Sequence, residues 1–229
     1  MTKNPNISKP VRSFVRREGR MTNAQKKALE ELKDKYGIDG AEKISDGYPF
    51  AKGTDIHLEI GFGDGELLIK QAQLYPKINF IGIEVHDPGI GHCLLQIENH
   101  NLCNVRIISH DAIEVLEEQI GNTSLERINI YFPDPWPKKK HHKRRIIQLD
   151  FLDLLYEKLF SKGLLYIATD WENYKEHINF SIKDHGKFMS IQYHEHEGDQ
   201  AIDHPTSKFE QRGLKKGHKI WDWQLRKLI

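Results

Sequence analysis

The chain contains little cysteine and almost no net charge, and both shortages restrict what it can be. Its two cysteines, Cys93 and Cys103, are too few for a disulfide framework, so a reducing compartment is the simpler context. The 34 Lys and Arg residues nearly balance the 33 Asp and Glu residues, which gives a formal net charge of +1. A uniformly basic coat is excluded, and any surface that binds nucleic acid has to be local.

Long apolar runs are also missing. No stretch approaches the roughly 20 apolar residues that span a bilayer, and residues 1–20 lack the apolar core of a signal peptide. The chain has 229 residues, of which 38% are hydrophobic and 29% charged, and this is enough apolar material for a folded core. We therefore expect a cytoplasmic protein without a membrane partner.

The order of segments predicts one α/β domain behind a basic arm. Residues 1–22 carry six Lys or Arg against one Glu and are expected to form a flexible arm, whereas residues 23–229 form a single domain. The expected strands are Ile56–Ile60, Phe80–Val85, Val105–Ser109, Ile128–Phe132 and Leu164–Thr169. The expected helices are residues 23–36, capped by Thr22 or Asn23, and Glu66–Leu74, Pro88–Asn99, Ala112–Gln119, Ile146–Phe160 and Trp171–Asp184.

Strands that alternate with single helices favour right-handed crossovers. They predict a doubly wound, Rossmann-like sheet, mostly parallel, in a three-layer αβα arrangement. Two further strand-like runs, Phe188–Tyr193 and His218–Leu228, are expected to add an antiparallel edge, with a variable loop at residues 195–217 between them. Ligands of such sheets bind outside the carboxyl ends of the strands, so the residues after each strand are the candidates for a site.

A glycine-rich turn joins the first expected strand to its helix. Gly61 and Gly63 let a ligand lie against bare backbone, although a plain tight turn is the alternative. A dinucleotide site would have a third glycine where Glu66 stands. With Glu59 and Asp64 nearby, three carboxylates would repel a diphosphate and suit a cation.

S-adenosylmethionine is a ligand of that kind, because it carries a sulfonium and an ammonium group and no phosphate. Glu84, at the end of the second strand, is placed to accept hydrogen bonds from both ribose hydroxyls, and Asp111 from the adenine amino group. The alternatives make Asp64 and Asp111 helix caps and Glu84 a solvated strand end. The order of these acids along the chain favours the cofactor.

The fourth expected strand runs into the segment Phe132–Pro137, Phe-Pro-Asp-Pro-Trp-Pro. Prolines on both sides hold Asp134 in a stiff, extended loop. Stiffness suits a carboxylate that has to meet a substrate in one geometry. The alternative is a rigid loop in which Trp136 is a hydrophobic peg.

A basic run follows the proline-rich loop directly. Six of its eight residues are permanent cations, in the order Lys138, Lys139, Lys140, His141, His142, Lys143, Arg144, Arg145. Beside a candidate catalytic loop in an otherwise neutral protein, such a run is typical of phosphate contacts to a nucleic acid. A solvated face and a nuclear-localisation signal are the alternatives.

On these residues the chain resembles the tRNA (guanine-N7-)-methyltransferase family of the single-chain bacterial type, which belongs to the class I S-adenosylmethionine-dependent methyltransferases. The resemblance runs from about Ile56 to Asp222. It rests on the glycine turn, the Pro-Asp-Pro-Trp loop with its basic run, and three further motifs: Gly82–His86, Thr169-Asp170 and Ser207–Glu210.

The resemblance implies methyl transfer from S-adenosylmethionine to N7 of a guanine in the variable loop of tRNA, at conventional position 46. The implied cofactor site comprises Glu59, Gly61, Gly63, Glu84, Asp111 and Asp134, with Asp134 also catalytic. Implied substrate contacts are Lys138, Asp170, Ser207, Lys208, Phe209 and Glu210, and implied RNA contacts are Lys140, His141, His142, Lys143, Arg144 and Arg145. Transfer RNA is the expected partner, no metal is expected, and the expected state is a monomer, with a homodimer as the alternative.

Several expectations stay open at this point. Many family members have Thr where Ser207 stands, so either Thr206 or Ser207 supplies that hydroxyl, and Pro137 occupies a position that is often polar. Asp170 is either a second orienting acid or the cap of the helix that follows. Cys93 is expected in the core, and a solvated strand edge is expected for the alternating His194 and His196. The rival functions are a methyltransferase with another acceptor atom and a non-catalytic RNA-binding protein.

Overall fold

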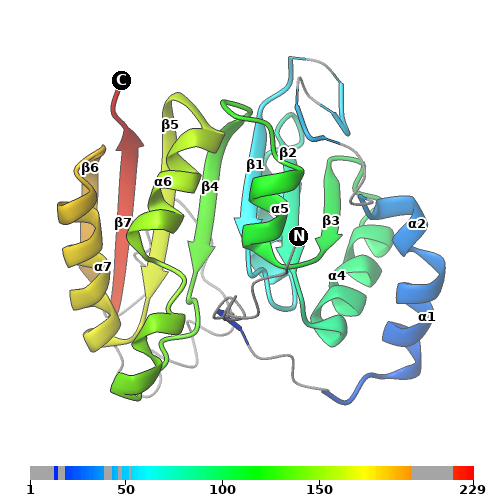
Figure 1. Cartoon of the computed structure of the whole chain (residues 1–229). Coiled ribbons are helices and arrows are strands. Elements are labelled where there is room, and N and C mark those ends of the chain that lie inside the picture. The colour runs from blue at the N-terminus through cyan, green and yellow to red at the C-terminus, as the bar shows by residue number, and fades with distance from the viewer. Residues whose placement is uncertain (1–12, 15–18, 39–42, 46–47, 52, 197–218) are drawn as a thin grey trace, which may run out of the picture.

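The computed structural model describes residues 13–14, 19–38, 43–45, 48–51, 53–196 and 219–229. Within these residues, seven strands form one sheet in the order β3-β2-β1-β4-β5-β7-β6 (Figure 1). Strands β1 to β5 run parallel, and β7 is antiparallel to both of its neighbours, β5 and β6. The expected doubly wound sheet with an antiparallel edge is confirmed.

The strands and helices follow one another as the alternation predicts. The strands are β1 (Ile56–Ile60), β2 (Asn79–Glu84), β3 (Val105–Ser109), β4 (Leu125–Tyr131), β5 (Leu159–Thr169), β6 (Phe188–His196) and β7 (Ile220–Lys227). The helices are α1 (Asn23–Glu31), α2 (Lys33–Tyr36), α3 (Glu66–Leu74), α4 (Asp87–Asn99), α5 (Ala112–Glu118), the short 3₁₀ helix η1 (Lys139–Arg144), α6 (Leu149–Lys158) and α7 (Glu172–His185).

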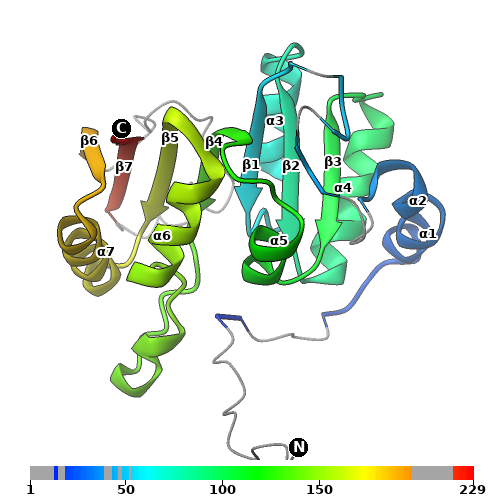
Figure 2. The same cartoon turned by 45° about the horizontal axis from the view of Figure 1, so that its top comes forward.

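Helices cover both faces of the sheet (Figure 2). Helices α1, α3 and α4 share one apolar core with the sheet, and α5, α6 and α7 share the other. All five residues of β1 are buried, as expected for a central parallel strand with a helical layer on each side. Cys93 lies in the α4 core and is 0% exposed, which confirms its structural role.

Two predicted helices have different boundaries. The helix after Thr22 breaks at Leu32 into α1 and α2, and its start is confirmed by a capping box between Thr22 and Gln25. The helix predicted over Ile146–Phe160 covers only Leu149–Lys158, and β5 begins at Leu159. The apolar pattern of this stretch fits both a helix and a strand, and pairing of Leu159 with β4 decides it.

The antiparallel edge ends in a buried contact between a histidine and a carboxylate. His196, the last residue of β6, lies 2.8 Å from the Asp222 carboxylate of β7, measured between Nε2 and Oδ2. The two residues are 5% and 3% exposed, so the solvated edge expected for His196 is wrong. Among the helices that the structure describes, none is long and apolar enough to span a bilayer.

Candidate active site

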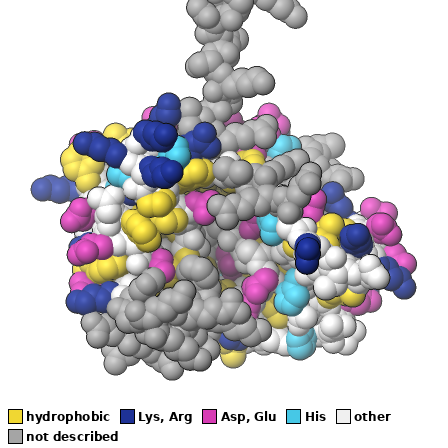
Figure 3. Space-filling view, turned by 90° about the horizontal axis from the view of Figure 1, so that it is seen from below, with side chains coloured by type: hydrophobic (Ala, Val, Ile, Leu, Met, Phe, Trp, Pro, Cys, Tyr) yellow, Lys and Arg dark blue, Asp and Glu magenta, His cyan; other side chains and the backbone are white. Residues whose placement is uncertain are grey.

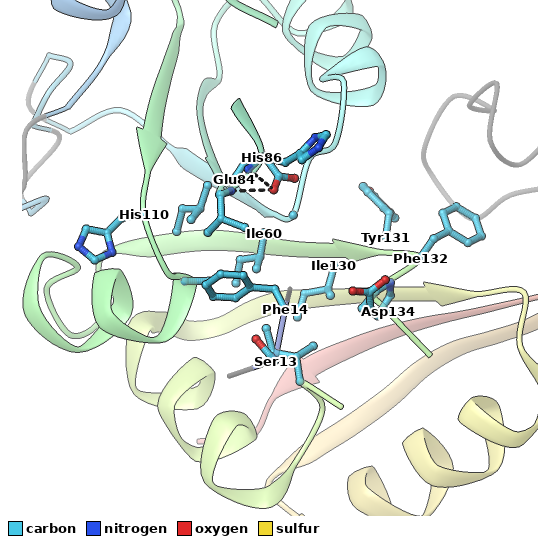
Figure 4. A pocket seen from close by; sticks show the side chains of 16 residues that line it. Ser13, Phe14, Ile60, Glu84, His86, His110, Ile130, Tyr131, Phe132 and Asp134 are labelled. Carbon is cyan, nitrogen blue, oxygen red and sulfur yellow. Dashed lines mark hydrogen bonds between the residues drawn. The ribbon is translucent and has the colours of Figure 1, made fainter. Parts of the chain in front are cut away.

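A cavity of about 310 Å³ opens at the carboxyl edge of the sheet (Figure 4). Because parallel strands end at one edge, residues that follow β1, β2, β3 and β4 meet there. Ile60, Ile83 and Ile130 give it apolar walls. Three of the cofactor-site residues named in the sequence analysis line it, namely Gly61, Glu84 and Asp134.

The turn after β1 leaves open space beside its backbone. Gly61 and Gly63 have φ values of +73° and +60°, which residues with a Cβ rarely adopt. A Cβ built on either glycine would meet no described atom within 4 Å. A ligand can therefore lie directly against this backbone.

Glu84 is fixed by three backbone amides. Its Oε2 accepts a hydrogen bond from Gly63 N at 2.9 Å, and its Oε1 accepts from Val85 N at 2.7 Å and from His86 N at 3.1 Å. These bonds tie the end of β2 to the glycine turn and hold the carboxylate at the cavity wall. Glu84 is partly exposed, so the strand end meets solvent while its carboxylate is held in place.

Asp64 and Asp111 both bind the first turn of a helix. Asp64 Oδ1 accepts from Glu66 N at 3.2 Å. Asp111 is the N-cap of α5, where its Oδ1 accepts from Ile113 N at 2.8 Å. The capping alternative is therefore confirmed for Asp111, whereas the N-cap of α3 is Gly65 and Asp64 stands one residue before it. Asp111 is not among the residues that line the cavity, although both of its chain neighbours are.

Glu59 lies on the opposite side of β1 from the cavity. Its neighbour Ile60 lines the cavity, and side chains alternate along a strand. Glu59 is 3% exposed, and its Oε2 has no hydrogen-bond partner among the residues described. Burial raises the pKa of this carboxyl to about 8, while the nearby Arg127 charge opposes the shift.

The Pro-Asp-Pro-Trp loop carries Asp134 to the cavity from the end of β4. Asp134 is exposed, and Figure 4 shows Glu84 and Asp134 on either side of Ile60 and Ile130. Trp136 is partly buried and its indole N–H donates to Ser13 O at 3.0 Å. The loop thus uses Trp136 as an anchor and presents Asp134 to the cavity.

Ser13 and Phe14 also line the cavity (Figure 4), and the sequence analysis did not predict this. They belong to the basic arm, in which Phe14 is the one aromatic residue. An isolated aromatic side chain in a polar segment was the available signal. The arm's contact with Trp136 and the cavity is a tertiary contact across 123 positions of the chain.

Most of the basic run faces solvent. Lys138, Lys139, Lys140 and Lys143 are exposed, and His141, His142 and Arg144 are partly exposed. Figure 3 shows Lys and Arg side chains gathered on one side of the face that contains the carboxyl edge of the sheet. Burial, followed by the Lys140 and Arg144 charges, lowers the pKa of His141.

Arg145 does not belong to this surface. It is 2% exposed, and its guanidinium donates to Pro135 O at 2.9 Å, Asn173 O at 3.2 Å and Asn173 Oδ1 at 2.7 Å. The expectation that Arg145 contacts RNA is therefore wrong, because its side chain is buried inside the protein. A count of charges in the sequence cannot separate it from Lys143 or Arg144.

Asp170 follows β5 and does not cap α7. The N-cap of α7 is Trp171, whose own side chain makes no capping hydrogen bond, and Trp171 N donates to Thr169 Oγ1 at 3.3 Å. The capping alternative for Asp170 is therefore wrong. The remaining implied substrate contacts, Ser207, Lys208, Phe209 and Glu210, lie outside the described residues, as does Thr206.

The chemistry of this site fits S-adenosylmethionine. A bare glycine backbone, a fixed carboxylate and apolar walls suit an adenosine, and the buried Glu59 adds a carboxyl oxygen without a described partner under the same turn. Glu66 begins α3, where a diphosphate would need an uncrowded helix N-terminus. In the described parts of the chain, no three His, Cys, Asp or Glu side chains gather as a metal site.

Comparison with known proteins gives a consistent result at the level of sequence. Residues 53–223 match the model of the methyltransferase family Methyltransf_4. A protein of Nitrosococcus oceani named tRNA (guanine-N(7)-)-methyltransferase is 47% identical over 96% of this chain and 92% of its own length. A protein of the same name from Nitrosospira multiformis is 43% identical over 96% of this chain and 95% of its own length.

Solved structures support the fold. A precorrin-6y C5,15-methyltransferase from Geobacter metallireducens has a TM-score of 0.54 at 13% identity and covers 93% of this chain and 95% of its own. A 16S rRNA (adenine(1408)-N(1))-methyltransferase from Catenulisporales acidiphilia has a TM-score of 0.53 at 15% identity, with 76% and 86% covered. These likenesses confirm the class I methyltransferase fold.

Replacing Phe14 tests its place in the cavity. We expect F14A to raise the Kd for S-adenosylmethionine about tenfold, because a buried phenyl ring contributes on the order of 1.5–3 kcal/mol of apolar burial. Calorimetry measures the Kd. The matched control is F180A, since Phe180 is 67% exposed on α7. An unchanged or lower Kd for F14A contradicts the assignment, and a lower one indicates that Phe14 competes with the cofactor.

The buried Glu59 predicts a pH-dependent stability. Between its ordinary pKa of 4.5 and its raised pKa of about 8, the folded chain binds more protons than the unfolded chain, so the free energy of unfolding falls as pH rises. In E59Q the side chain is an amide that does not titrate, so the folded variant does not bind this extra proton. We expect the Tm of E59Q to exceed that of the wild type by a margin that grows across this pH range.

Thermal unfolding at a series of pH values measures this margin. The control is E118Q, which removes an exposed carboxylate from the end of α5. A Tm difference between E59Q and wild type that stays constant with pH contradicts the raised pKa.

Proposed function

The chain belongs to the tRNA (guanine-N7-)-methyltransferase family, and we propose that it methylates N7 of the guanine at conventional position 46, in the variable loop of tRNA. The observation that carries this proposal is the position of Asp134. It lines the same cavity as the glycine turn and Glu84, and the exposed cations of the basic run begin four residues after it, at Lys138. One edge of the sheet thus offers a cofactor site and an RNA surface side by side.

The reaction needs alignment and charge stabilisation more than proton transfer. Guanine N7 carries a lone pair and no proton, so no base is required to create the nucleophile. S-adenosylmethionine supplies an electrophilic methyl group on a positively charged sulfur. As the N7–methyl bond forms and the sulfur–methyl bond breaks, positive charge moves onto the base. A fixed carboxylate that faces this charge stabilises it.

We assign that role to Asp134, which also accepts hydrogen bonds from the guanine N1–H and exocyclic amine. Prolines on both sides restrict its backbone, so little reorganisation is needed when the base arrives. Its exposure leaves it accessible to a base brought in from solvent. Asp170, at the end of the neighbouring strand β5, is the second orienting acid.

The proposal also assigns roles in cofactor binding. Glu84 accepts from the ribose hydroxyls beside the bare backbone of Gly61 and Gly63. Asp111 accepts from the adenine amino group through Oδ2, since Oδ1 caps α5. Glu59 supplies a buried carboxyl group beneath the turn, from the far side of β1.

The RNA surface of the proposal is the exposed part of the basic run. Lys140, His141, His142, Lys143 and Arg144 contact the RNA backbone, and Lys138 contacts the substrate together with residues 207–210. We further propose that residues 23–229 act as a single methyltransferase domain behind the basic arm of residues 1–22. In this proposal the protein is a cytoplasmic monomer whose partner is tRNA.

Removing the Asp134 charge tests its catalytic role. D134N keeps the size of the side chain, and we expect turnover to fall on the order of 10²-fold, as for other preorganised electrostatic contacts. The Kd for S-adenosylmethionine should change much less. The measurement is transfer of labelled methyl from the cofactor to a tRNA pool, followed by location of the modified base.

The control for D134N is D150N, which removes an exposed carboxylate from the first turn of α6. Wild-type turnover in D134N would show that its carboxylate does not stabilise the transition state. Methylation of a different atom by the wild type contradicts the proposed function itself.

The exposed lysines predict a salt-dependent affinity for tRNA. Replacing Lys139, Lys140 and Lys143 with Ala should raise the Kd and lower the slope of log Kd against log salt by about two to three, because each phosphate contact contributes roughly 0.7–0.9 to that slope. A control with the same change of charge replaces Lys26, Lys27 and Lys33, which are exposed on α1 and α2. Equal slopes for the two triple variants contradict an RNA surface at the basic run.

A further inference from the structure

We propose that Arg145 is a positioning residue for the reaction, because its guanidinium fastens the loop that carries Asp134 to the first turn of α7. This inference rests on the proposed function and adds a residue to it. It reverses the role that the sequence suggests for Arg145, from a contact with RNA to a contact inside the protein.

The guanidinium bridges two segments that are far apart in the sequence. Nε donates to the carbonyl of Pro135, one residue from Asp134, while the two terminal nitrogens donate to the carbonyl and the side-chain oxygen of Asn173. Asn173 lies in the first turn of α7. The fork geometry of a guanidinium allows it to meet three acceptors at once.

The surroundings of Arg145 are closed. The guanidinium carbon lies 4.8 Å from the centre of the Tyr174 ring, which is 0% exposed, and the Tyr174 hydroxyl accepts from Ile147 N at 3.3 Å. Burial lowers the pKa of Arg145. A buried cation is costly unless it is fully hydrogen-bonded, and here the acceptors are oxygens of the loop and of α7.

The proline-rich loop has few backbone N–H groups that could bind neighbouring segments. Pro133, Pro135 and Pro137 have no backbone N–H to donate, so the backbone of each can be bound only at its carbonyl oxygen. On one side of Asp134, Phe132 N donates to Ala168 O at 2.9 Å and continues the pairing of β4 with β5. On the other side, Arg145 holds the carbonyl of Pro135. The two anchors enclose Asp134.

The RNA-facing cations lie between Trp136 and Arg145 in the chain, and they pack on the same loop. The Arg144 guanidinium carbon lies 5.0 Å from the centre of the Trp136 ring, and His141 packs edge-on to that ring at 5.8 Å. The basic run therefore follows the Asp134 loop in the chain and also packs back on it through His141, Arg144 and Arg145. Arg145, the last residue of the run, is buried, whereas Lys143 is exposed.

Three variants test the proposal. R145M removes the guanidinium and keeps an apolar stem, R145K retains one charged donor, and N173A removes one acceptor from an exposed position. We expect kcat to fall about 10²-fold in R145M, since a small misplacement of a catalytic group costs that much. R145K should recover part of this loss, and N173A should lose about three- to tenfold. The Kd values for tRNA and for S-adenosylmethionine should match those of the control K183M, which removes an exposed cation from the other end of α7.

Each outcome decides a different point. A raised Kd for tRNA with wild-type kcat in R145M overturns the proposal in favour of an RNA contact. Wild-type kcat in both R145M and N173A overturns it as well. If R145M does not fold, N173A and R145K decide the question, with a wild-type Tm required beside a lowered kcat. A wild-type protein that leaves tRNA guanine unmethylated contradicts the proposed function rather than the role of Arg145.

Discussion

The site depends on one constraint, which is that parallel strands end at the same edge of their sheet. Gly61, Glu84 and Asp134 come from three different strand ends and line one cavity. Further contacts then fix the carboxylates: three backbone amides hold Glu84, and prolines, Phe132 N and Arg145 hold the loop around Asp134. The negative charges are in place before a ligand arrives, which is the arrangement that electrostatic stabilisation requires.

Local separation of charge explains how a protein with a net charge of +1 accommodates two ligands of opposite sign. Acidic groups lie in and beneath the cavity, where the methyl donor brings positive charge. Exposed lysines gather beside it on η1 and at its N-cap, where the proposed function places the negatively charged RNA backbone. Trp136 joins the two regions, because it packs against Arg144 and bonds to the arm that lines the cavity. In the proposed function, the same short segment therefore links RNA binding to the position of Asp134.

The sequence was sufficient to predict the order of elements and the residues at the strand ends, including Glu84 and Asp134. It was insufficient wherever burial decided a role. Arg145 has the same formal charge as its exposed neighbours, and only packing against α7 distinguishes it. Glu59 lies in a strand buried on both faces, so alternation could not tell which face it meets. Phe14 reaches the cavity through a contact between distant parts of the chain, and no local pattern reports such a contact.

The central claim is that Asp134 faces the positive charge that methyl transfer creates on guanine. The most direct measurement is a structure of the protein with S-adenosylhomocysteine and substrate tRNA. The account predicts that the target guanine lies in the cavity with N7 toward the sulfur and the Asp134 carboxylate within about 4–6 Å of its ring, close enough to favour the charged form. A guanine bound with N7 turned from the sulfur, or with Asp134 pointing away into solvent, would contradict it.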